Sequence, residues 1–307
     1  MSFSEIQKNL LKETAGIESI PAGAYNIRSN GKLAGRNVTA NIDIKTKTDK
    51  PGIDIFIKPE TKGERVDIPV ILTESGLNDL VYNDFFVGDG ADVVIVAGCG
   101  ICNTGHDKTE HDGVHSFHIG KNARVKYIEK HYGEGDGSGE KVLNPSTIIK
   151  IDEGGYMEMD TAQIKGVDST VRKTEATLEK SATLIVREKI MTHGKQTAVT
   201  DFYVNLKGEN CKAHVISRSI AKDHSHQHYI SCIDGNAACS GRTECDAIIM
   251  DNGTVTAEPK LNANSIDASL VHEAAIGKIA GEQLIKLMSL GLTEKEAEEK
   301  IVNGFLK

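Results

Sequence analysis

The sequence predicts a mainly β protein, a parallel (right-handed) β-helix with a short N-terminal helical segment and α-helices at the C-terminus. From Asn144 to about Asn264, strand-like segments such as STIIKID, ATLIVREKIMT and CDAIIMD follow one another, with short breaks such as EGG and DNG. No helical period interrupts this stretch, and hairpin dipeptides are scarce apart from Asn252–Gly253. An antiparallel sandwich or barrel is the alternative architecture.

The composition favours strands and argues against several classes of function. Trp is absent and 30 of the 307 residues are Gly, so aliphatic residues and Thr must build the core. The 36 Lys and Arg against 44 Asp and Glu give a net charge of −8, which argues against nucleic-acid binding. No apolar run of about 18 residues predicts a membrane span, and the N-terminus lacks the apolar region of a secretory signal. We therefore expect a cytoplasmic protein whose six cysteines are free thiols or ligands.

The N-terminal region combines a short helix with alternating strands. Residues 2–14 read as a helix that Ser2 or Ser4 can cap, with one apolar face made of Ile6, Leu10 and Leu11. From about residue 20 to residue 73 the apolar and polar residues alternate, which predicts strands.

The next region contains a buried strand, a Cys-rich turn and a loop. Val93–Ala97 reads as a fully buried strand, and the cysteines of AGCGICN follow it in a predicted turn. His131–Gly139, HYGEGDGSG, reads as a flexible loop, because four glycines at alternate positions oppose packed structure.

The C-terminus returns to helices. From Ile276 to Lys307 apolar residues recur at intervals of three and four residues, which is typical of helices. Gly291 ends one helix, and Thr293 with Glu296 makes a capping box for the next. We divide the chain into an N-terminal helix and strand region (1–80), a β-helix core (81–270) and a C-terminal helical domain (271–307).

The densest group of potential ligands is Cys99-x2-Cys102 with the four histidines that follow it, His106, His111, His115 and His118. A Cys-x2-Cys turn lets two thiolates reach one metal. No second Cys pair follows at zinc-ribbon spacing, so the pattern favours an iron–sulfur or open metal site over a closed zinc site. The alternative is an inert turn with surface histidines.

Two further groups lie in the strand-rich region. His224, His226 and His228 follow Asp223 at a spacing of two, which places them on one face of a strand, as metal ligands or as a polar ladder. Cys232, Cys239 and Cys245, followed by His272–Glu273, match no standard metal loop, but a coiled architecture can stack distant residues on neighbouring rungs. Small buried apolar residues are the simplest reading of Cys211 and Cys239.

Motifs at the C-terminus resemble a known family. RTECDAIIMDNG and the later VHEAAIGKIAGEQLIKLMSLGLTEKEAEEKIVNGF resemble the SufB/SufD family of iron–sulfur cluster assembly scaffolds, specifically from Thr243 to Phe305. The chain length and the AGCGICN…HDGVHSFHIG stretch are similar to the minimal SufB-like (SmsB) form. The resemblance implies a β-helix scaffold, not an enzyme, that builds a transient [2Fe–2S] or [4Fe–4S] iron–sulfur cluster and passes it to apo-proteins.

The resemblance also implies roles for individual residues. Cys245 matches the family's essential thiolate at the dimer interface, His272 its functional His, and Glu273 an acidic residue near the nascent cluster. The preceding residue, acidic in many relatives, is Val271 here. Cys99 and Cys102 stand outside that site and are expected as additional ligands. Secondary candidates are Cys232, His224, His226 and His228.

The partners are also implied by the resemblance. The C-terminal helices match the surface that docks a SufC-like ABC ATPase, here through Gln283, Leu284, Leu287, Met288, Ile301 and Phe305. We expect a homodimer within a B2C2 complex, with a sulfur donor and apo iron–sulfur proteins as further partners, and no nucleic acid or membrane. The alternatives are a structural partner of the ATPase, disfavoured by Cys245 beside His272–Glu273, and a secreted-type β-helix hydrolase or lyase, disfavoured by the missing Trp and signal peptide.

Overall fold

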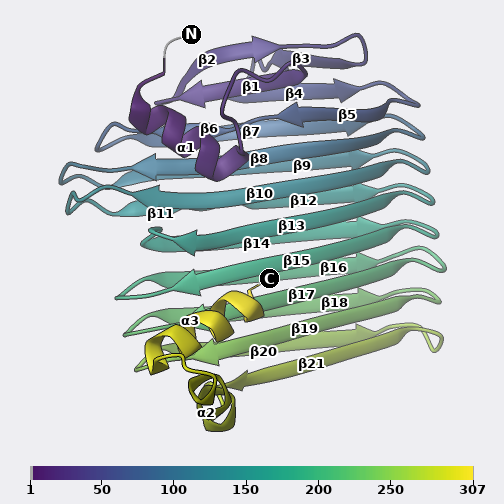
Figure 1. Cartoon of the computed structure of the whole chain (residues 1–307). Helices are drawn as coiled ribbons and strands as arrows, with labels where there is room; N and C mark the ends of the chain where they lie inside the picture. The colour runs from purple at the N-terminus through teal and green to yellow at the C-terminus, as the bar shows by residue number, and fades with distance from the viewer. Residues whose placement is uncertain (1–2, 307) are drawn as a thin grey trace.

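The fold consists of two long sheets that face each other across a shared interior (Figure 1). The computed structural model describes residues 3–306. The chain passes back and forth between the sheets, so that each sheet collects alternate strands and pairs them in parallel, as in β17 (Lys212–Ala221) beside β19 (Ser240–Ile249). This β-solenoid of about eight turns confirms the predicted β-helix and excludes the antiparallel sandwich or barrel.

Sheet A lies on the side that carries the helices (Figure 1). Its other strands are β1 (Ala24–Ser29), β2 (Lys32–Asn37), β5 (Lys62–Asp67), β6 (Val70–Leu72), β8 (Asp92–Cys102), β10 (Arg124–Glu134), β13 (Tyr156–Lys165), β15 (Thr183–Thr192) and β21 (Ser269–Gly277). They are hydrogen-bonded in the order β2–β1–β5–β8–β10–β13–β15–β17–β19–β21, with β6 beside β1 and β8.

Sheet B forms the opposite wall. Its strands are β3 (Ile42–Thr46), β4 (Gly52–Ile57), β7 (Asn78–Val87), β9 (Thr109–Ile119), β11 (Lys141–Leu143), β12 (Ser146–Ile151), β14 (Ser169–Leu178), β16 (Thr197–Leu206), β18 (His226–Gly235) and β20 (Thr254–Ala263). Their order is β20–β18–β16–β14–β11–β9–β7–β4–β3, with β12 beside β9 and β14.

Alternation along each strand separates the interior from the two outer faces. Inward side chains form one long apolar core, which includes the stacked rings of Phe85 and Phe117, 4.4 Å apart. Cys211 and Cys239 are buried in this core. Cys211 directly precedes Lys212 and Cys239 directly precedes Ser240, and Lys212 and Ser240 are register partners. They therefore occupy equivalent corners of consecutive rungs, as small buried residues, which confirms the simplest reading of both.

The two ends of the solenoid differ. At the N-terminal end, β2 and β3 pair antiparallel with β1 and β4 and close the stack. At the C-terminal end, β20 and β21 are the last strands of their sheets. The apolar residues of this last rung, among them Leu261 and Leu270, pack against the core but are only partly buried. The C-terminal end of the core is therefore open within the described chain.

Helix α1 (Glu5–Ala15) lies on the outer face of sheet A over β8 and β10 (Figure 1). Ser4, one of the two expected caps, caps the helix, whereas Ser2 lies outside the described residues. Leu10 and Leu11 of the predicted apolar face are buried, whereas Ile6 is 45% exposed. Gly98 permits the close approach, since a Cβ there would lie 2.5 Å from the carbonyl oxygen of Thr14.

The glycine-rich segment differs from the predicted flexible loop. Residues 131–134 belong to strand β10, and only the following residues leave the sheet. A Cβ at Gly133 would lie 2.0 Å from the carbonyl oxygen of Gly166, and a Cβ at Gly137 would lie 2.2 Å from that of Gly105. The glycines are thus required for close backbone packing between rungs.

The C-terminal helices are α2 (Gly281–Ser289) and α3 (Glu294–Phe305). The helical region begins later than predicted, because Ile276 still belongs to β21. Gly291, with a φ of +96°, follows the end of α2, and the capping box of Thr293 and Glu296 begins α3, both as predicted. The α3 end reaches sheet A, where Arg218 donates to the Phe305 carbonyl oxygen. In the described part of the chain, no helix has the length and apolar character needed to span a membrane.

Candidate functional site

Cys245 points into the interior near the open end of the solenoid. It lies on β19 between the inward residues Thr243 and Ala247, and its exposed fraction is 1%. Its register partners are Ser217 on the preceding rung and Ala274 on the last rung. Burial raises the pKa of the Cys245 thiol to about 12, with the charges of Glu188 and Asp246 acting in the same direction. In this environment the thiol is protonated until a cation that stabilises the thiolate binds the sulfur.

His272 lies on the last rung and faces the same interior as Cys245. Its register partner on β19 is Thr243, which is buried and hydrogen-bonded to Tyr229 at 2.8 Å. The Nδ1 atom of His272 is buried and has no hydrogen-bond partner among residues 3–306. Burial lowers the pKa of His272, which favours the neutral imidazole that binds metals. Cys245 and His272 are therefore diagonal neighbours across one interstrand spacing of about 4.8 Å.

Glu273 does not join these two residues within the chain. Successive residues of a strand point to opposite faces, so Glu273 lies on the outer face while His272 points inward. On that outer face Arg242 Nη2 donates to Glu273 Oε2 at 2.7 Å. Residues 3–306 hold no group of three or more His, Cys, Asp or Glu side chains arranged to bind one metal ion.

The predicted Cys-rich turn is a straight strand. Cys99 and Cys102 both lie on β8, and a spacing of three residues places their side chains on opposite faces. Cys99 packs inward with Leu143, whereas Cys102 packs under α1 with Leu10. The two thiols therefore do not meet.

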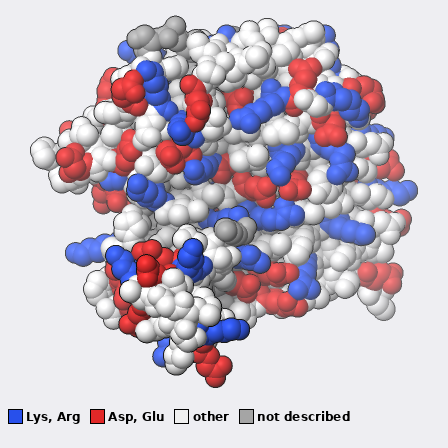
Figure 2. Space-filling view, viewed as in Figure 1, with Lys and Arg blue, Asp and Glu red and all other residues white. Residues whose placement is uncertain are grey.

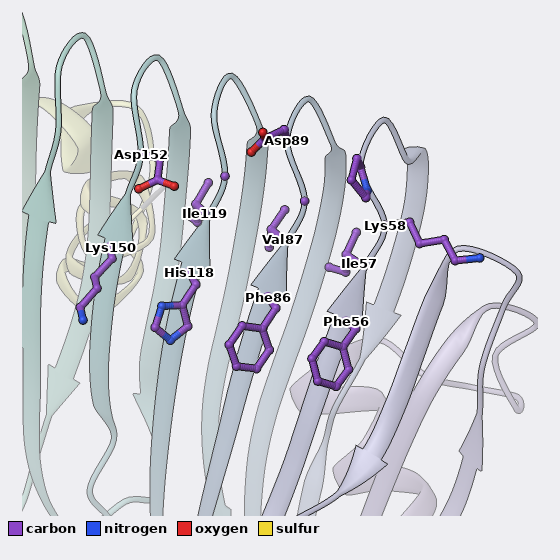
Figure 3. A pocket seen from close by; sticks show the side chains of 13 residues that line it. Phe56, Ile57, Lys58, Phe86, Val87, Asp89, His118, Ile119, Lys150 and Asp152 are labelled. Carbon is purple, nitrogen blue, oxygen red and sulfur yellow. The ribbon is translucent and has the colours of Figure 1, made fainter.

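The histidines that follow Cys99 separate in the same way. His111 and His115 point inward from β9, whereas His118 lies on the outer face and His106 lies in the loop before the strand. His118 stacks on Phe86, which stacks on Phe56, with ring centroids 5.0 Å apart in both pairs. These rings line a shallow groove of 540 Å³ on sheet B (Figure 3).

The secondary candidates lie on the outer face of sheet B, away from Cys245. His226 bonds to Thr254 at 2.7 Å and His228 to Glu258 at 2.9 Å, while His224 lies in the turn before β18. Cys232 points outward from the same strand and contacts Asp234 at 3.7 Å. His226 and His228 share one face, as the spacing predicts, but the prediction is wrong for His224, because the strand begins only at His226.

Buried charges inside the middle rungs were not found from the sequence. Arg172 donates to Glu129 at 2.9 Å and to Glu188 at 3.1 Å, and all three side chains are buried. Ser217 donates to Glu188 at 3.0 Å and is the register partner of Cys245. Strand alternation in the sequence could have revealed these buried charges, because each of these residues occupies an inward position of an alternating strand.

These buried charges have shifted pKa values. Burial acts to raise the pKa of Glu129, but His131, Arg172 and His115 lower it to about 2. Burial raises the pKa of Glu188. Burial also lowers the pKa of His131 to about 4, so that this imidazole is neutral. The Arg172 cation is therefore needed to compensate the interior carboxylates.

The C-terminal helices expose apolar side chains. In α2, Leu284 and Leu287 are half-buried, while Ile285 and Met288 are exposed. Ile301 and Phe305 of α3 are half-buried. On the face that carries these helices, positive and negative side chains are interleaved (Figure 2). Among the ion pairs of sheet A, Lys126 and Arg187 both contact Glu158.

The chain was compared with known proteins. Residues 81–305 match the family model described as SUF system FeS cluster assembly, SufBD core domain. An iron–sulfur cluster assembly SufBD family protein of Archaeoglobus fulgidus is 31% identical over 80% of this chain and 66% of its own length. Proteins of the same description from Methanocaldococcus jannaschii and Pyrococcus horikoshii are 29% and 28% identical, over 80% and 91% of this chain and 78% and 86% of their own lengths.

Proposed function

The chain belongs to the SufBD family of iron–sulfur cluster assembly proteins, and we propose that it is the scaffold on which the cluster is built. The observation that carries the proposal is the shared orientation of Cys245 and His272. Both side chains face the interior at the open end of the solenoid, and His272 Nδ1 has no partner there among the described residues. A thiolate and a neutral imidazole are ligands that iron accepts.

We propose that iron and sulfide are substrates at this site. When Fe²⁺ reaches Cys245, it replaces the thiol proton, because a nearby cation favours the thiolate. His272 then supplies a nitrogen ligand that iron can exchange when the cluster leaves. A transient [2Fe–2S] or [4Fe–4S] cluster needs more ligands than these two residues offer, so a second protomer would have to contribute the others.

A homodimer through the last rung would bring those ligands. β20 and β21 each have one edge without a paired strand in the described chain, and an exposed sheet edge favours pairing with another chain. Pairing there would cover the partly buried Leu261 and Leu270 and bring two copies of Cys245 and His272 to one interface. Glu273 remains a predicted participant, from its outer position beside Arg242.

We propose that α2 and α3 dock a SufC-like ABC ATPase, giving a cytoplasmic B2C2 complex. Exposed Ile285 and Met288 give α2 an apolar face with no counterpart in the described chain. ATP binding by the partner would shift the population of interface arrangements, and the scaffold itself would hydrolyse nothing. A sulfur donor and apo iron–sulfur proteins complete the proposed set of partners.

Cluster transfer to an apo-ferredoxin tests the scaffold role. Cys245→Ala should abolish transfer by the reconstituted complex while ATPase docking is retained. Cys211→Ala is the matched control, because this equally buried cysteine stacks in the rung corner and should tolerate Ala. Transfer at the wild-type rate by Cys245→Ala would contradict the proposal.

A further inference from the structure

The outer face of sheet B carries an aromatic row near the N-terminal end of the solenoid. Phe56, Phe86 and His118 are register partners on β4, β7 and β9, and their rings stack almost in parallel, at interplanar angles of 10° and 5°. Stacking covers the faces between the rings, so their exposed surface consists largely of ring edges. Phe56 and Phe86 are 38% and 36% exposed, although outer positions of a strand are usually polar.

A groove of 540 Å³ runs along this row, beside corners that lack side chains (Figure 3). Gly88 and Gly120 form these corners, directly after β7 and β9. A Cβ at Gly88 would lie 2.4 Å from the backbone nitrogen of Pro59, and a Cβ at Gly120 would lie 2.5 Å from Asp89 Oδ1. Close packing therefore requires glycine at both corners, and the space beside the rings stays open.

Four charged side chains line the groove, and two of them are engaged elsewhere. Lys58 donates to a backbone carbonyl oxygen at 2.7 Å, and Asp89 accepts from a backbone N–H at 2.8 Å. Lys150 and Asp152 have no ion pair and no side-chain hydrogen bond within residues 3–306. An ammonium and a carboxylate without partners thus stand together at one end of the groove (Figure 3).

The position of this charge pair relative to the rings follows from the register. Lys150 on β12 is the register partner of His118, so it continues the aromatic row onto the next rung. Asp152 lies two residues further along the chain, just beyond the end of β12. Two residues of extended chain span about 7 Å, so one ligand atom that carries both an ammonium and a carboxylate fits between the two side chains.

We propose that the groove binds a free aromatic α-amino acid. The ligand ring lies across the edges of Phe56 and Phe86, because the positive edge of an aromatic ring attracts the negative face of another. The α-carboxylate pairs with Lys150 and the α-ammonium pairs with Asp152. A ligand with only one charge leaves either Lys150 or Asp152 unpaired, so the zwitterion is the complementary species.

Isothermal titration calorimetry of the metal-free full chain with L-phenylalanine tests the proposal. We expect saturable binding at one site per chain, weakened about threefold by Lys150→Gln and by Asp152→Asn, as for exposed ion pairs. Lys173→Gln is the matched control, because Lys173 is exposed on β14 but does not line the groove. The absence of saturable binding, or equal losses in all three variants, would overturn the proposal.

Ligand analogues test which charge each residue recognises. L-phenylalaninamide lacks the carboxylate, so Lys150→Gln should no longer weaken its binding, and N-acetyl-L-phenylalanine lacks the ammonium, so Asp152→Asn should no longer matter. L-alanine keeps both charges without a ring and should bind about threefold to tenfold more weakly than L-phenylalanine. Equal effects of Lys150→Gln on L-phenylalanine and its amide would overturn the assignment of the carboxylate. No iron is present, so these results are independent of the scaffold role.

Discussion

Cys245 and His272 face the same interior on consecutive rungs, although His272 and its sequence neighbour Glu273 face opposite sides of sheet A. The register of β19 and β21 produces both facts, because it pairs His272 with Thr243 and Glu273 with Glu244. The cluster site we propose is thus half formed within one chain. The remaining cluster ligands must come from whatever covers the last rung, formed by β20 and β21.

The interior ion group predicts a large loss of stability on removal of its cation. Arg172→Met leaves Glu129 and Glu188 buried without compensation, which should lower the free energy of unfolding by about 3–5 kcal/mol. Arg187→Met is the matched control. It removes a half-exposed partner of Glu158, so a loss of less than about 1 kcal/mol is expected. Urea unfolding measures both changes in the free energy of unfolding. Equal losses would show that the buried ion pairs of Arg172 contribute no more to stability than the half-exposed pair of Arg187.

Two buried histidines predict a loss of stability in mild acid. Burial lowers the pKa of His115 and of His131 to about 4, below the 6.5 of an unperturbed histidine. Between these pKa values the unfolded chain binds more protons than the folded chain, so the free energy of unfolding falls as the pH falls. Urea unfolding at about pH 7, 6 and 5 should show this decline, and His131→Gln should make it shallower. An unchanged slope in the variant would contradict the assignment.

The glycine contact between rungs predicts intolerance at Gly133. A Cβ there would overlap the carbonyl oxygen of Gly166, so Gly133→Ala should lower the melting temperature by several degrees, about 1–3 kcal/mol. Gly304→Ala is the control, because nothing lies within 4 Å of its added Cβ and Ala favours the helix. Calorimetry distinguishes the two. A Gly133→Ala protein as stable as the wild type would show that the backbone at Gly133 is not closely packed against Gly166.

The C-terminal helices predict a specific docking defect. Met288→Asp places a charge on the exposed apolar face of α2 and should weaken binding of a SufC-like ATPase at least tenfold, since burying an unpaired charge costs more than about 1.4 kcal/mol. Glu299→Ala, on an exposed position of α3, should bind normally. Isothermal titration calorimetry with the purified ATPase measures both. Unchanged binding by Met288→Asp would place the docking surface elsewhere.

The fold was predictable because every rung repeats the same local pattern. Strand alternation between Asn144 and Asn264, with few hairpin signals, needs only parallel stacking to bury its apolar faces. The caps at Ser4 and Thr293 were also readable, because capping is a local interaction. The cluster candidates at Cys245 and His272 came from resemblance, and the structure places both on one inner face.

Contacts between rungs were not predictable, because the rungs differ in length. His131 follows its partner Cys99 by 32 residues, whereas Cys245 follows Ser217 by 28. A slip of one residue reverses the face of every side chain. This is why the salt bridges of Arg172, which join different rungs, were missed. Cys99 and Cys102 were expected to meet for another reason, because a turn was predicted where β8 continues. The glycines from Gly133 were taken for flexibility because the opposing backbone is invisible in the sequence.

The central claim is that the cluster forms at Cys245 and His272. Its most direct test is anaerobic reconstitution with Fe²⁺ and sulfide, followed by visible absorption and Mössbauer spectroscopy. The proteins are the wild type, Cys245→Ala, His272→Ala and the Cys99→Ala/Cys102→Ala double variant. We predict that the cluster signal is lost with Cys245→Ala, weakened with His272→Ala and retained by the double variant. A full signal in Cys245→Ala, or its loss only in the double variant, would contradict the claim.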